Sequence, residues 1–546
     1  MTGSGMTRRD FMKGMAATAA GAAAVGILGC SPDNGKTQAA ASAQTMASTA
    51  AGSEAASEKE IAETIKKDIV IVGCGAAGML AAYEAGKAKG GDILVISNSP
   101  NASSTNGSMV SGTCGVETPY TKEANETMTV EGLYDRMITF AHWTANARLL
   151  KTCVEMLPGN IDIFDEMGIE LALAGDRYSI GFQEVHLFGT ENKGDVMQKY
   201  IEDNYGVEFM FGTEAEELVM DGNKCVGVIA ANEDGDWIRI HAKAVLLACG
   251  GYIANEEMLK EVYGDMEIMA LSTAWQTGKG IKMAEAAGAF RESTHGMGMS
   301  DIVGANKKAG FNLGENMLLG AALYGSLLVD PYGKRFMNEY MLANESMAGG
   351  GEATLHVSKY YAIYGQKVMD ALKEMGYYEY IGSPEFWVSG FLLYNAPIEN
   401  LDERIQEAID QGWCMKGETI AEVAEAAGLP ELEKTVKEYD EMAKAGKDKM
   451  FNKRMEMMRP VEDGGPYYLL EFNPGAFNTF GGCRTDEDTR ALRADFSVID
   501  GLYIAGVENG SLYSRPYYDV GGTCSGLAYS SGRLAGMKMA EYVKNR

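Results

Sequence analysis

The sequence contains no pair of cysteines at C-x-x-C spacing, and this absence excludes several classes of protein. Its nine cysteines are scattered through 546 residues, and none belongs to a C-x-x-C-H haem-attachment site. The pattern therefore predicts no iron–sulfur cluster, no covalently attached haem and no disulfide framework. No group of His, Cys and Asp residues has the spacing of metal ligands, so no metal site is expected either.

Positive charge is also scarce. Lys and Arg number 48 against 76 Asp and Glu, which gives a formal net charge of -28. This excess of acid argues against binding to nucleic acid and against electrostatic docking on anionic lipid. With 46% hydrophobic and 23% charged residues the composition is that of a globular protein, and the length suits two or three domains.

The N-terminal region lacks an apolar run that could cross a bilayer, since Gly14 to Gly29 is short and rich in small residues. Residues 1–30, which include Arg8 and Arg9, resemble a twin-arginine export signal. Ile27-Leu-Gly-Cys30 also resembles a lipoprotein cleavage site, with an acylated Cys30 as the mature N-terminus. Residues 31–60 hold mostly Ala, Ser, Thr and Gln and are expected to form a flexible linker. The predicted location is the cell envelope, at the outer face of the cytoplasmic membrane or in the periplasm.

Glycine, in contrast, is abundant, and three glycines directly follow a predicted strand. Asp68 to Val72 is the β-branched apolar run of a parallel strand that is covered on both faces. Gly73, Gly75 and Gly78 then have G-x-G-x-x-G spacing, and Met79 to Lys89 is predicted to be a helix. In dinucleotide-binding proteins such glycines make a tight turn, admit a pyrophosphate and allow close helix–strand packing at the helix N-terminus. The alternative is a glycine-rich turn without a ligand.

A second predicted strand, Asp92 to Ile96, ends at Ser97-Asn98, where most dinucleotide-binding units carry an acidic residue for the ribose. Ser97 or Asn98 is expected to bind the ribose in its place. Residues 103–115 follow as a run of small residues. Either their backbone closely approaches something flat and polar, or they form a flexible turn.

Hydrophobic periodicity and turn residues predict the remaining elements. One long helix is expected over Leu133 to Met156, with a break at Pro158-Gly159. The other expected helices are Ile161 to Met167, Ile281 to Ala287 and Ser525 to Val543, and the expected strands are Val207 to Val219, Lys224 to Ala231, Trp237 to His241, Ala244 to Gly251 and Gly501 to Gly506.

Several motifs occur together in one order along the chain: the glycine motif, Ala-Cys-Gly-Gly at 248–251, Thr-Gly-Lys-Gly at 277–280, Gly-Lys-Arg-Phe-Met-Asn-Glu at 333–339, and Gly-Leu-Tyr-Ile-Ala-Gly followed by Gly-Gly-Thr at 521–523. Residues 66–546 thereby resemble the flavoprotein family of fumarate reductases, succinate dehydrogenases and 3-ketosteroid dehydrogenases. The resemblance implies an α/β fold with a Rossmann-like FAD-binding domain, in two parts at 61–295 and 476–546. It also implies an inserted α+β capping domain at 296–475 that closes over FAD.

The cofactor implied is FAD rather than NAD, and the motifs assign it a set of residues. These are Gly73, Gly75, Ala76, Ala77, Gly78, Ser97, Asn98, Ser104, Thr105, Asn106, Gly107, Gly250, Gly251, Glu508, Gly521, Gly522 and Thr523.

The arginines and histidine with which fumarate reductases bind their dicarboxylate are largely missing. No arginine follows Asn338-Glu339, Asn478 stands at the position of the histidine, and Asp519-Val520 stands where an arginine precedes the Gly-Gly pair. A dicarboxylate without arginines is poorly bound, because bidentate Arg–carboxylate pairs supply both orientation and charge compensation. Fumarate is therefore not the expected substrate.

The candidate catalytic residues are Tyr517, Arg515, Tyr518 and Glu339. Tyr517 lies four residues before Gly521, where 3-ketosteroid dehydrogenases also carry an active-site tyrosine, and its hydroxyl could donate a proton. Arg515 could bind a carbonyl or a single carboxylate and lower the pKa of a nearby phenol. The alternatives are an ion pair for Arg515, aromatic packing for Tyr517 and Tyr518, and a loop cap for Glu339.

These residues leave three functions open. The first is an exported ene-reductase that acts on an α,β-unsaturated carbonyl or carboxylate compound in anaerobic respiration. Its electrons would come from a separate carrier, a cytochrome or a quinol-linked protein. The second is the reverse reaction, desaturation of a ketone or steroid-like compound. The third is a lipoprotein that binds a nucleotide without chemistry.

Overall fold

The computed structural model describes residues 60–174, 184–299, 306, 308, 326–344, 349–381 and 397–546. The arginine pair Arg8-Arg9 and Cys30 lie outside the described residues, so the export signal and the lipid anchor stay predictions. Within the described ranges, no helix combines the length and apolar character that a membrane crossing requires.

The core of the larger body is a parallel sheet. Its strands run in the order β20 (Val498–Ile504), β11 (Ala244–Leu247), β2 (Ile69–Val72), β3 (Ile93–Ile96) and β7 (Glu208–Met210). All residues of β2, β3 and β11 are buried, as expected for a sheet with both faces covered. The three strands predicted around residues 70, 94 and 246 are confirmed.

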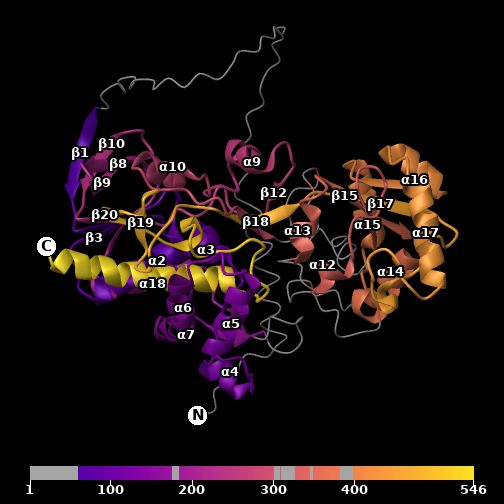
Figure 1. The fold of residues 1–546 in the computed structure, drawn as a ribbon, viewed down its shortest axis with the longest axis horizontal. Helices are drawn as coiled ribbons and strands as arrows, with labels where there is room; N and C mark the ends of the chain where they lie inside the picture. Colours follow the sequence, from indigo (N-terminus) through magenta and orange to yellow (C-terminus); the bar gives the residue numbers. More distant parts are fainter. Residues whose placement is uncertain are drawn as a thin grey trace, which may run out of the picture.

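The first and last helices of the described chain pack side by side on this sheet (Figure 1). They are α2 (Ala76–Lys87) and α18 (Thr523–Lys544). A Cβ atom on Gly532 would lie 2.0 Å from the Ala77 carbonyl oxygen, and one on Gly536 would lie 2.3 Å from that of Ala81. Only glycine therefore permits this approach of the two helices.

A mixed extension continues the sheet at one side. It comprises β1 (Ile61–Lys66), β10 (Trp237–His241), β9 (Lys224–Ala231) and β8 (Glu214–Asp221), and β19 (Arg490–Leu492) pairs with β20. In this extension β1 pairs with β10 in parallel, whereas β10 and β8 pair with β9 in antiparallel. The predicted strands for β9 and β10 are confirmed.

The single strand predicted over Val207 to Val219 is wrong, because this stretch forms the end of one strand and the start of another. β7 ends at Met210 and β8 begins at Glu214. Gly212 between them has a φ of +57°, and the Thr213 amide donates to the Ser97 carbonyl at 2.8 Å. The chain therefore turns here before it joins β9.

The single helix predicted over Leu133 to Met156 is also wrong. The structure has α5 (Val130–Phe140) and α6 (Ala147–Glu155). His142 and Trp143 have positive φ angles of 49° and 59°, which no α-helix accommodates, and Asn146 caps α6 through its side chain. Pro158 does not break a helix but lies in the first turn of α7 (Leu157–Glu166), where its missing N–H costs nothing.

A second body contains an antiparallel sheet of β14 (Leu327–Val329), β15 (Tyr360–Gly365), β17 (Tyr467–Phe472) and β16 (Cys414–Gly417). Around it pack α14 (Gln366–Ile381), α15 (Leu401–Asp410), α16 (Ile420–Ala427) and α17 (Leu432–Lys444). Figure 1 labels β15, β17 and α14 to α17 among them, and shows these elements, in orange, apart from α2 and α18. All of them lie within the predicted insertion at 296–475, whose bounds stay a prediction.

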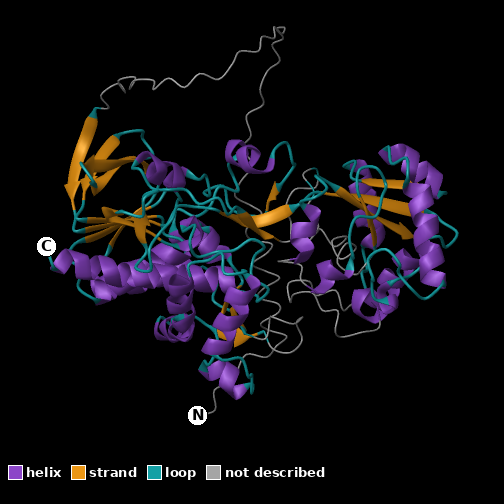
Figure 2. Ribbon diagram, in the orientation of Figure 1, coloured by secondary structure: helices purple, strands orange, loops and turns teal. Residues whose placement is uncertain are grey.

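A small three-stranded sheet lies where the chain passes between the two bodies, with β18 at its centre (Figure 2). Its strands are β12 (Met269–Ala270), β18 (Gly475–Phe480) and β13 (Gly296–Met299). The remaining described elements are α3 (Asn106–Met109), β4 (Gly112–Cys114), α4 (Pro119–Glu123), β5 (Leu171–Leu173), β6 (Val185–Phe188), α8 (Lys193–Tyr205), α9 (Glu256–Tyr263), α10 (Lys279–Ala286), α12 (Tyr340–Asn344) and α13 (Gly351–Thr354). The predicted α/β fold is confirmed.

Candidate cofactor and active site

The three glycines of the motif differ in what surrounds them. Gly73 has a φ of +102°, and a Cβ there would lie 2.3 Å from the Ala248 carbonyl oxygen. A Cβ on Gly78 would lie 1.8 Å from the carbonyl oxygen of Gly73. Gly75 has no atom within 4 Å of its Cβ position. Two glycines therefore serve the fold, while the third leaves space open to a ligand.

This space lies at the N-terminus of α2. Gly75 is the N-cap of the helix, and no side chain caps it. The first amides of the helix, including those of Ala76 and Ala77, thus keep the free N–H groups and partial positive charge that bind phosphate. The open space and the uncapped helix fit the pyrophosphate of a dinucleotide.

The small-residue segment is held against the same helix. A Cβ on Gly107 would lie 2.3 Å from the Ala76 nitrogen, and the Tyr529 hydroxyl donates to the Gly107 carbonyl at 3.3 Å. Asn106 donates through Nδ2 to the Phe477 carbonyl of β18 at 3.3 Å. Ser104 and Thr105 are used locally: the Ser104 amide and hydroxyl both donate to Asn101 Oδ1, and Thr105 caps α3. The segment is therefore a fixed wall of the candidate site.

The end of β3 gives its two predicted ribose ligands different environments. Ser97 is buried, and its hydroxyl lies 2.8 Å from the hydroxyl of Ser99, with which it shares a hydrogen bond. Asn98 is half-buried. Of the two, Asn98 is the side chain more open to a ligand.

Glu508 is fully buried next to the segment that follows β11. Its Oε2 accepts a hydrogen bond from the Cys249 amide at 2.8 Å, whereas its Oε1 has no partner among the described residues. Gly280 passes so close that a Cβ would lie 1.9 Å from Oε1. Burial raises the pKa of the Glu508 carboxyl to about 8, so it is protonated at neutral pH. A buried oxygen without a partner is expected where a bound group completes the site.

Gly250 and Gly251 frame the neighbouring loop. Gly250 has a φ of +86°, and the Gly251 amide donates to Gln276 Oε1 at 3.1 Å. Gly250 is half-buried and Gly251 is buried. The backbone here is thereby held close to the end of β11.

A second uncapped helix N-terminus belongs to α18. Its N-cap, Gly522, has a φ of +72° and no side-chain cap, and its carbonyl accepts a hydrogen bond from the Cys114 amide at 3.0 Å. Gly521 before it is buried, and the Thr523 hydroxyl donates to the Val520 carbonyl at 2.8 Å. α18 runs for 22 residues, so the N-terminus of a long helix is available to an electron-rich group.

Tyr517 lies at this helix N-terminus. Its phenol oxygen accepts a hydrogen bond from the Cys524 amide at 2.6 Å and lies 3.0 Å from the Thr523 hydroxyl. The ring stacks on Phe480 with centroids 5.7 Å apart, and only 3% of the residue is exposed. Burial raises the pKa of the phenol well above its usual value, so Tyr517 retains its proton at neutral pH.

Arg515, two residues earlier, connects the two bodies. Its Nε donates to Glu352 Oε2 of α13 at 3.0 Å, while the arginine side chain remains 41% exposed. Glu352 Oε1 is buried without a partner among the described residues. Arg515 is therefore placed to meet both a carboxylate of the protein and a small molecule.

The structure adds an arginine to which the sequence assigned no role. Arg291 donates through Nε to the Gly481 carbonyl at 3.3 Å and lies over the Tyr252 ring at 5.3 Å. Its Nη2 is buried without a partner in the described part of the chain. The Tyr252 hydroxyl lies 3.4 Å from Nδ1 of His295. Burial, with Arg291 and then Arg515 nearby, lowers the pKa of His295. No local motif marks Arg291, because its hydrogen bond goes to a residue 190 positions away and its ring contact to one 39 positions away.

Tyr518 and Glu339 are engaged elsewhere. The Tyr518 hydroxyl donates to the Leu512 carbonyl at 2.9 Å, and 1% of the residue is exposed. Glu339 is fully buried in the second body, where it receives Nε and Nη2 of Arg335, each at 2.8 Å. Their catalytic roles stay predictions that this placement does not support.

The positions that differ from fumarate reductases also have partners. Asp519 accepts hydrogen bonds from Nε and Nη2 of Arg136 at 3.1 and 2.9 Å. Asn478 Nδ2 lies 3.0 Å from the Cys524 sulfur. Asp519 thus ties the segment that carries Arg515 and Tyr517 to α5.

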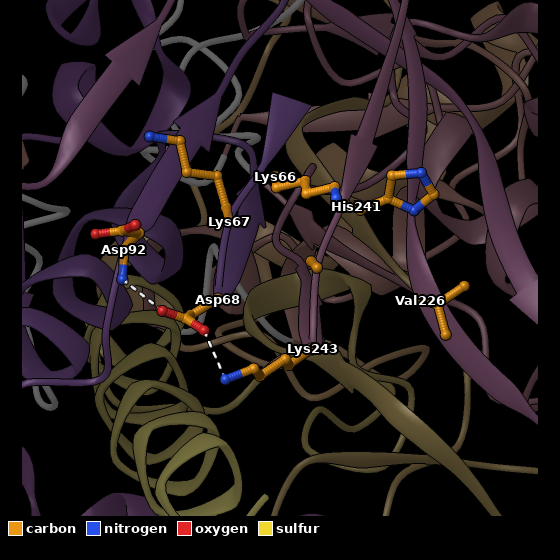
Figure 3. A pocket seen from close by; sticks show the side chains of 8 residues that line it. Lys66, Lys67, Asp68, Asp92, Val226, His241 and Lys243 are labelled. Carbon is orange, nitrogen blue, oxygen red and sulfur yellow. Dashed lines mark hydrogen bonds and ion pairs between the residues drawn. The ribbon is translucent and has the colours of Figure 1, made fainter. Parts of the chain in front are cut away.

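A surface pocket of about 430 Å³ lies away from this site (Figure 3). It forms around Asp68 and Asp92, which precede β2 and β3, whereas the glycine motif follows β2. Lys243 pairs with Asp68 at 2.8 Å and, through this hydrogen bond, lowers the pKa of the aspartate. The pocket is therefore at the other end of the strands and takes no part in the candidate site. Its lining residues are Lys66, Lys67, Asp68, Asp92, Val226, His241, Ala242 and Lys243.

Comparison with known proteins agrees with this geometry. A family model described as "FAD binding domain" matches residues 68–524. The chain is 26% identical to the vinyl phenol reductase of Lactiplantibacillus plantarum, over 87% of this chain and 97% of that protein. It is 23% identical to the NADH:fumarate oxidoreductase of Klebsiella pneumoniae, over 87% of this chain and 48% of that protein.

A 3-oxosteroid 1-dehydrogenase of Mycobacterium tuberculosis is 30% identical over 56% of this chain and 54% of its own length. The chain thus spans about half the length of some of its relatives. The open conformation of a flavocytochrome c3 fumarate reductase superposes with a TM-score of 0.63 at 20% identity, over 89% of this chain and 79% of that one. This last likeness bears on the fold.

Proposed function

Because this chain belongs to the FAD-binding-domain family, in which FAD is the cofactor of oxidoreductases, we propose a specific activity for it. The protein reduces the activated C=C bond of an α,β-unsaturated carbonyl or carboxylate compound. It does so in the cell envelope, as the terminal step of a respiratory chain. The named substrates of two relatives, vinyl phenol and fumarate, both contain a C=C bond and support this reaction class.

The observation that carries the proposal is the position of the segment 514–520. Arg515 in this segment reaches Glu352 of the second body, and Tyr517 in the same segment contacts the first turn of α18 at 2.6 Å. This short segment thus places a cation next to α13 and a phenol at the N-terminus of α18.

Each residue then has a defined task. FAD, when bound and reduced by the electron donor, would supply the hydride for the β-carbon of the substrate. Arg515 orients the carbonyl or carboxylate of the substrate, and because Glu352 already neutralises part of its charge, one carboxylate rather than two is the better fit. Tyr517 holds a proton for the α-carbon, and the Cys524 amide stabilises the phenol oxygen as that proton leaves.

The electron donor proposed is a separate carrier, a cytochrome or a quinol-linked protein. The sequence has no C-x-x-C-H motif for haem attachment, and the predicted export signal would place the protein where soluble NADH is scarce. The twin-arginine route and the acylation of Cys30 belong to this proposal.

The test is an anaerobic assay with purified, FAD-loaded protein, reduced viologen and a panel of enones, enoates and vinyl phenols. Oxidation of the dye by at least one unsaturated monocarboxylate or enone is expected, with slower oxidation by fumarate. If no compound oxidises the dye while a saturated ketone reduces an oxidised dye, the ene-reductase proposal is wrong.

That last outcome would favour a second candidate, desaturation of a ketone or steroid-like compound. The observation in its favour is the 30% identity to a 3-oxosteroid 1-dehydrogenase over 56% of this chain. The same assay separates the two, because it reports the direction of electron flow for each compound.

A further inference from the structure

Lys193 is a buried lysine that the proposed reaction does not use. It is 4% exposed and begins α8, directly after Asn192, whose φ of 51° is left-handed. Within the described ranges no carboxylate pairs with its ammonium. Burial lowers the pKa of Lys193 to about 7. Burying such a charge costs free energy, so its hydrogen bonds must compensate for the loss of water.

Those hydrogen bonds go to the backbone of the small-residue segment. The Lys193 ammonium donates to the carbonyl of Ser108 and, at 2.8 Å, to that of Val110. It also lies 4.6 Å from the centroid of the Phe188 ring. The lysine thus supplies donors to carbonyls at the C-terminal end of α3.

The rest of the first turn of α8 also forms hydrogen bonds with the small-residue segment. The Gly194 amide donates to the Ser108 hydroxyl at 2.9 Å. The Asp195 amide donates to the Ser103 hydroxyl at 3.0 Å, and Asp195 Oδ1 accepts from the Ser103 amide at 3.2 Å. A Cβ on Gly194 would lie 2.6 Å from the Ala102 carbonyl oxygen. The segment is therefore bound to α8 at both of its ends.

On its other side this segment faces the phosphate end of the cofactor site. Gly107 packs on the Ala76 nitrogen at the start of α2, next to the open space beside Gly75. Any outward movement of the segment away from α8 or α2 would change the width of that space. The contacts of Lys193 thus act on the site through the wall that they hold.

We propose that Lys193 is a positioning residue for FAD: by holding the Ser108 and Val110 carbonyls, it fixes the 102–110 segment against the N-terminus of α2 and slows release of the cofactor. The proposal needs FAD binding alone and is independent of the substrate and of the direction of the reaction.

The test measures FAD release from purified holoenzyme by the rise in free-flavin fluorescence after dilution. Lys193→Met keeps the length and apolar stem of the side chain but removes its donors, and we expect FAD to leave at least about tenfold faster. Lys193→Arg keeps a charged donor and is expected to recover part of the wild-type retention. Lys199→Met, in the same helix but at an exposed lysine paired with Asp203, is the matched control and should release FAD at the wild-type rate.

A second variant covers the case in which Lys193→Met does not fold. Asp195→Ala loosens the same segment at its exposed end without a buried charge, and faster FAD release is expected from it as well. A wild-type release rate in folded Lys193→Met, or in Asp195→Ala when the methionine variant is insoluble, would overturn the proposal. A loss of thermal stability without faster FAD release would do the same, since it would show a purely structural role.

Discussion

Two regions of the molecule treat buried polar groups in opposite ways. In the larger body, near the glycine motif, polar groups are left without protein partners: Glu508 Oε1 is buried and unpaired among the described residues, and no side chain caps the N-terminus of α2. In the second body, the buried side chains of Arg335, Glu339, Asp448 and Lys453 pair with one another, and of their polar atoms only Nη1 of Arg335 lacks a hydrogen-bond partner among the described residues.

We term the residues Arg335, Glu339, Asp448 and Lys453 the cap cluster. Arg335 binds Glu339 and, through Nη2 at 2.9 Å, Asp448, while Lys453 lies 3.4 Å from Glu339 Oε2. Two cations thus balance two anions, and these contacts hold the pKa of Asp448 below its usual range. Open polar groups mark a place for a ligand, whereas closed ones hold distant parts of the chain together.

The largest effect is expected from breaking the cap cluster. Arg335→Met leaves Asp448 buried without its arginine and Glu339 with Lys453 alone, which should cost about 3–5 kcal/mol of unfolding free energy. Denaturant unfolding measures it, with the exposed Lys434→Met as control. Unchanged stability with a large fall in kcat would instead support a catalytic role for Glu339.

The next effect concerns the Tyr517 phenol at the N-terminus of α18. Tyr517→Phe removes the proposed acid but keeps the ring on Phe480, so kcat should fall about 10²-fold with little change in KM or FAD content. Tyr518→Phe is the control, since its buried hydroxyl donates to the Leu512 carbonyl at 2.9 Å. Equal losses in the two variants would contradict the assignment to Tyr517.

A third prediction separates the glycines that serve the fold from the one that serves the ligand. Gly75→Val places its side chain in open space, so the apoprotein should fold normally while FAD affinity drops by at least about tenfold. Gly73→Ala should instead impair folding, because of its positive φ and the nearby Ala248 carbonyl. Calorimetric titration of apoprotein with FAD, beside thermal unfolding, distinguishes these outcomes.

The smallest effect is expected at the surface pocket, where the polar groups are neither open to the cofactor nor buried. Lys243 is 48% exposed, so Lys243→Met should change stability by less than about 1 kcal/mol and leave FAD binding unaltered. A change in FAD content in this variant would show that the two ends of the sheet are coupled.

The sequence allowed prediction wherever the physical cause was local. The strands β2, β3 and β11 follow from short β-branched runs, and the turn at Gly73 follows from the glycine spacing. A local signal was also present for Glu339, because Arg335 lies four residues before it. Opposite charges at this spacing pair on a helix, and the two long side chains also pair here.

Prediction failed where the cause was distant or conformational. The turn between α5 and α6 is made by His142 and Trp143, which are left-handed. Neither is a glycine, so the sequence gives no signal of this turn. Arg515 meets Glu352 across 163 positions and Arg291 meets Gly481 across 190, so no spacing could reveal either contact. Only the folded chain brings these groups to one place.

The central position of β20 determines when the sheet can be completed. β20 inserts between β11 and β9, and α18 packs along α2, so a strand in the middle of the sheet and the partner of the first helix both come from the last 50 or so residues described. The sheet and the second helix terminus at the site are therefore incomplete until β20 and α18 have been synthesised. A chain that stops before Val498 consequently has no complete site to load.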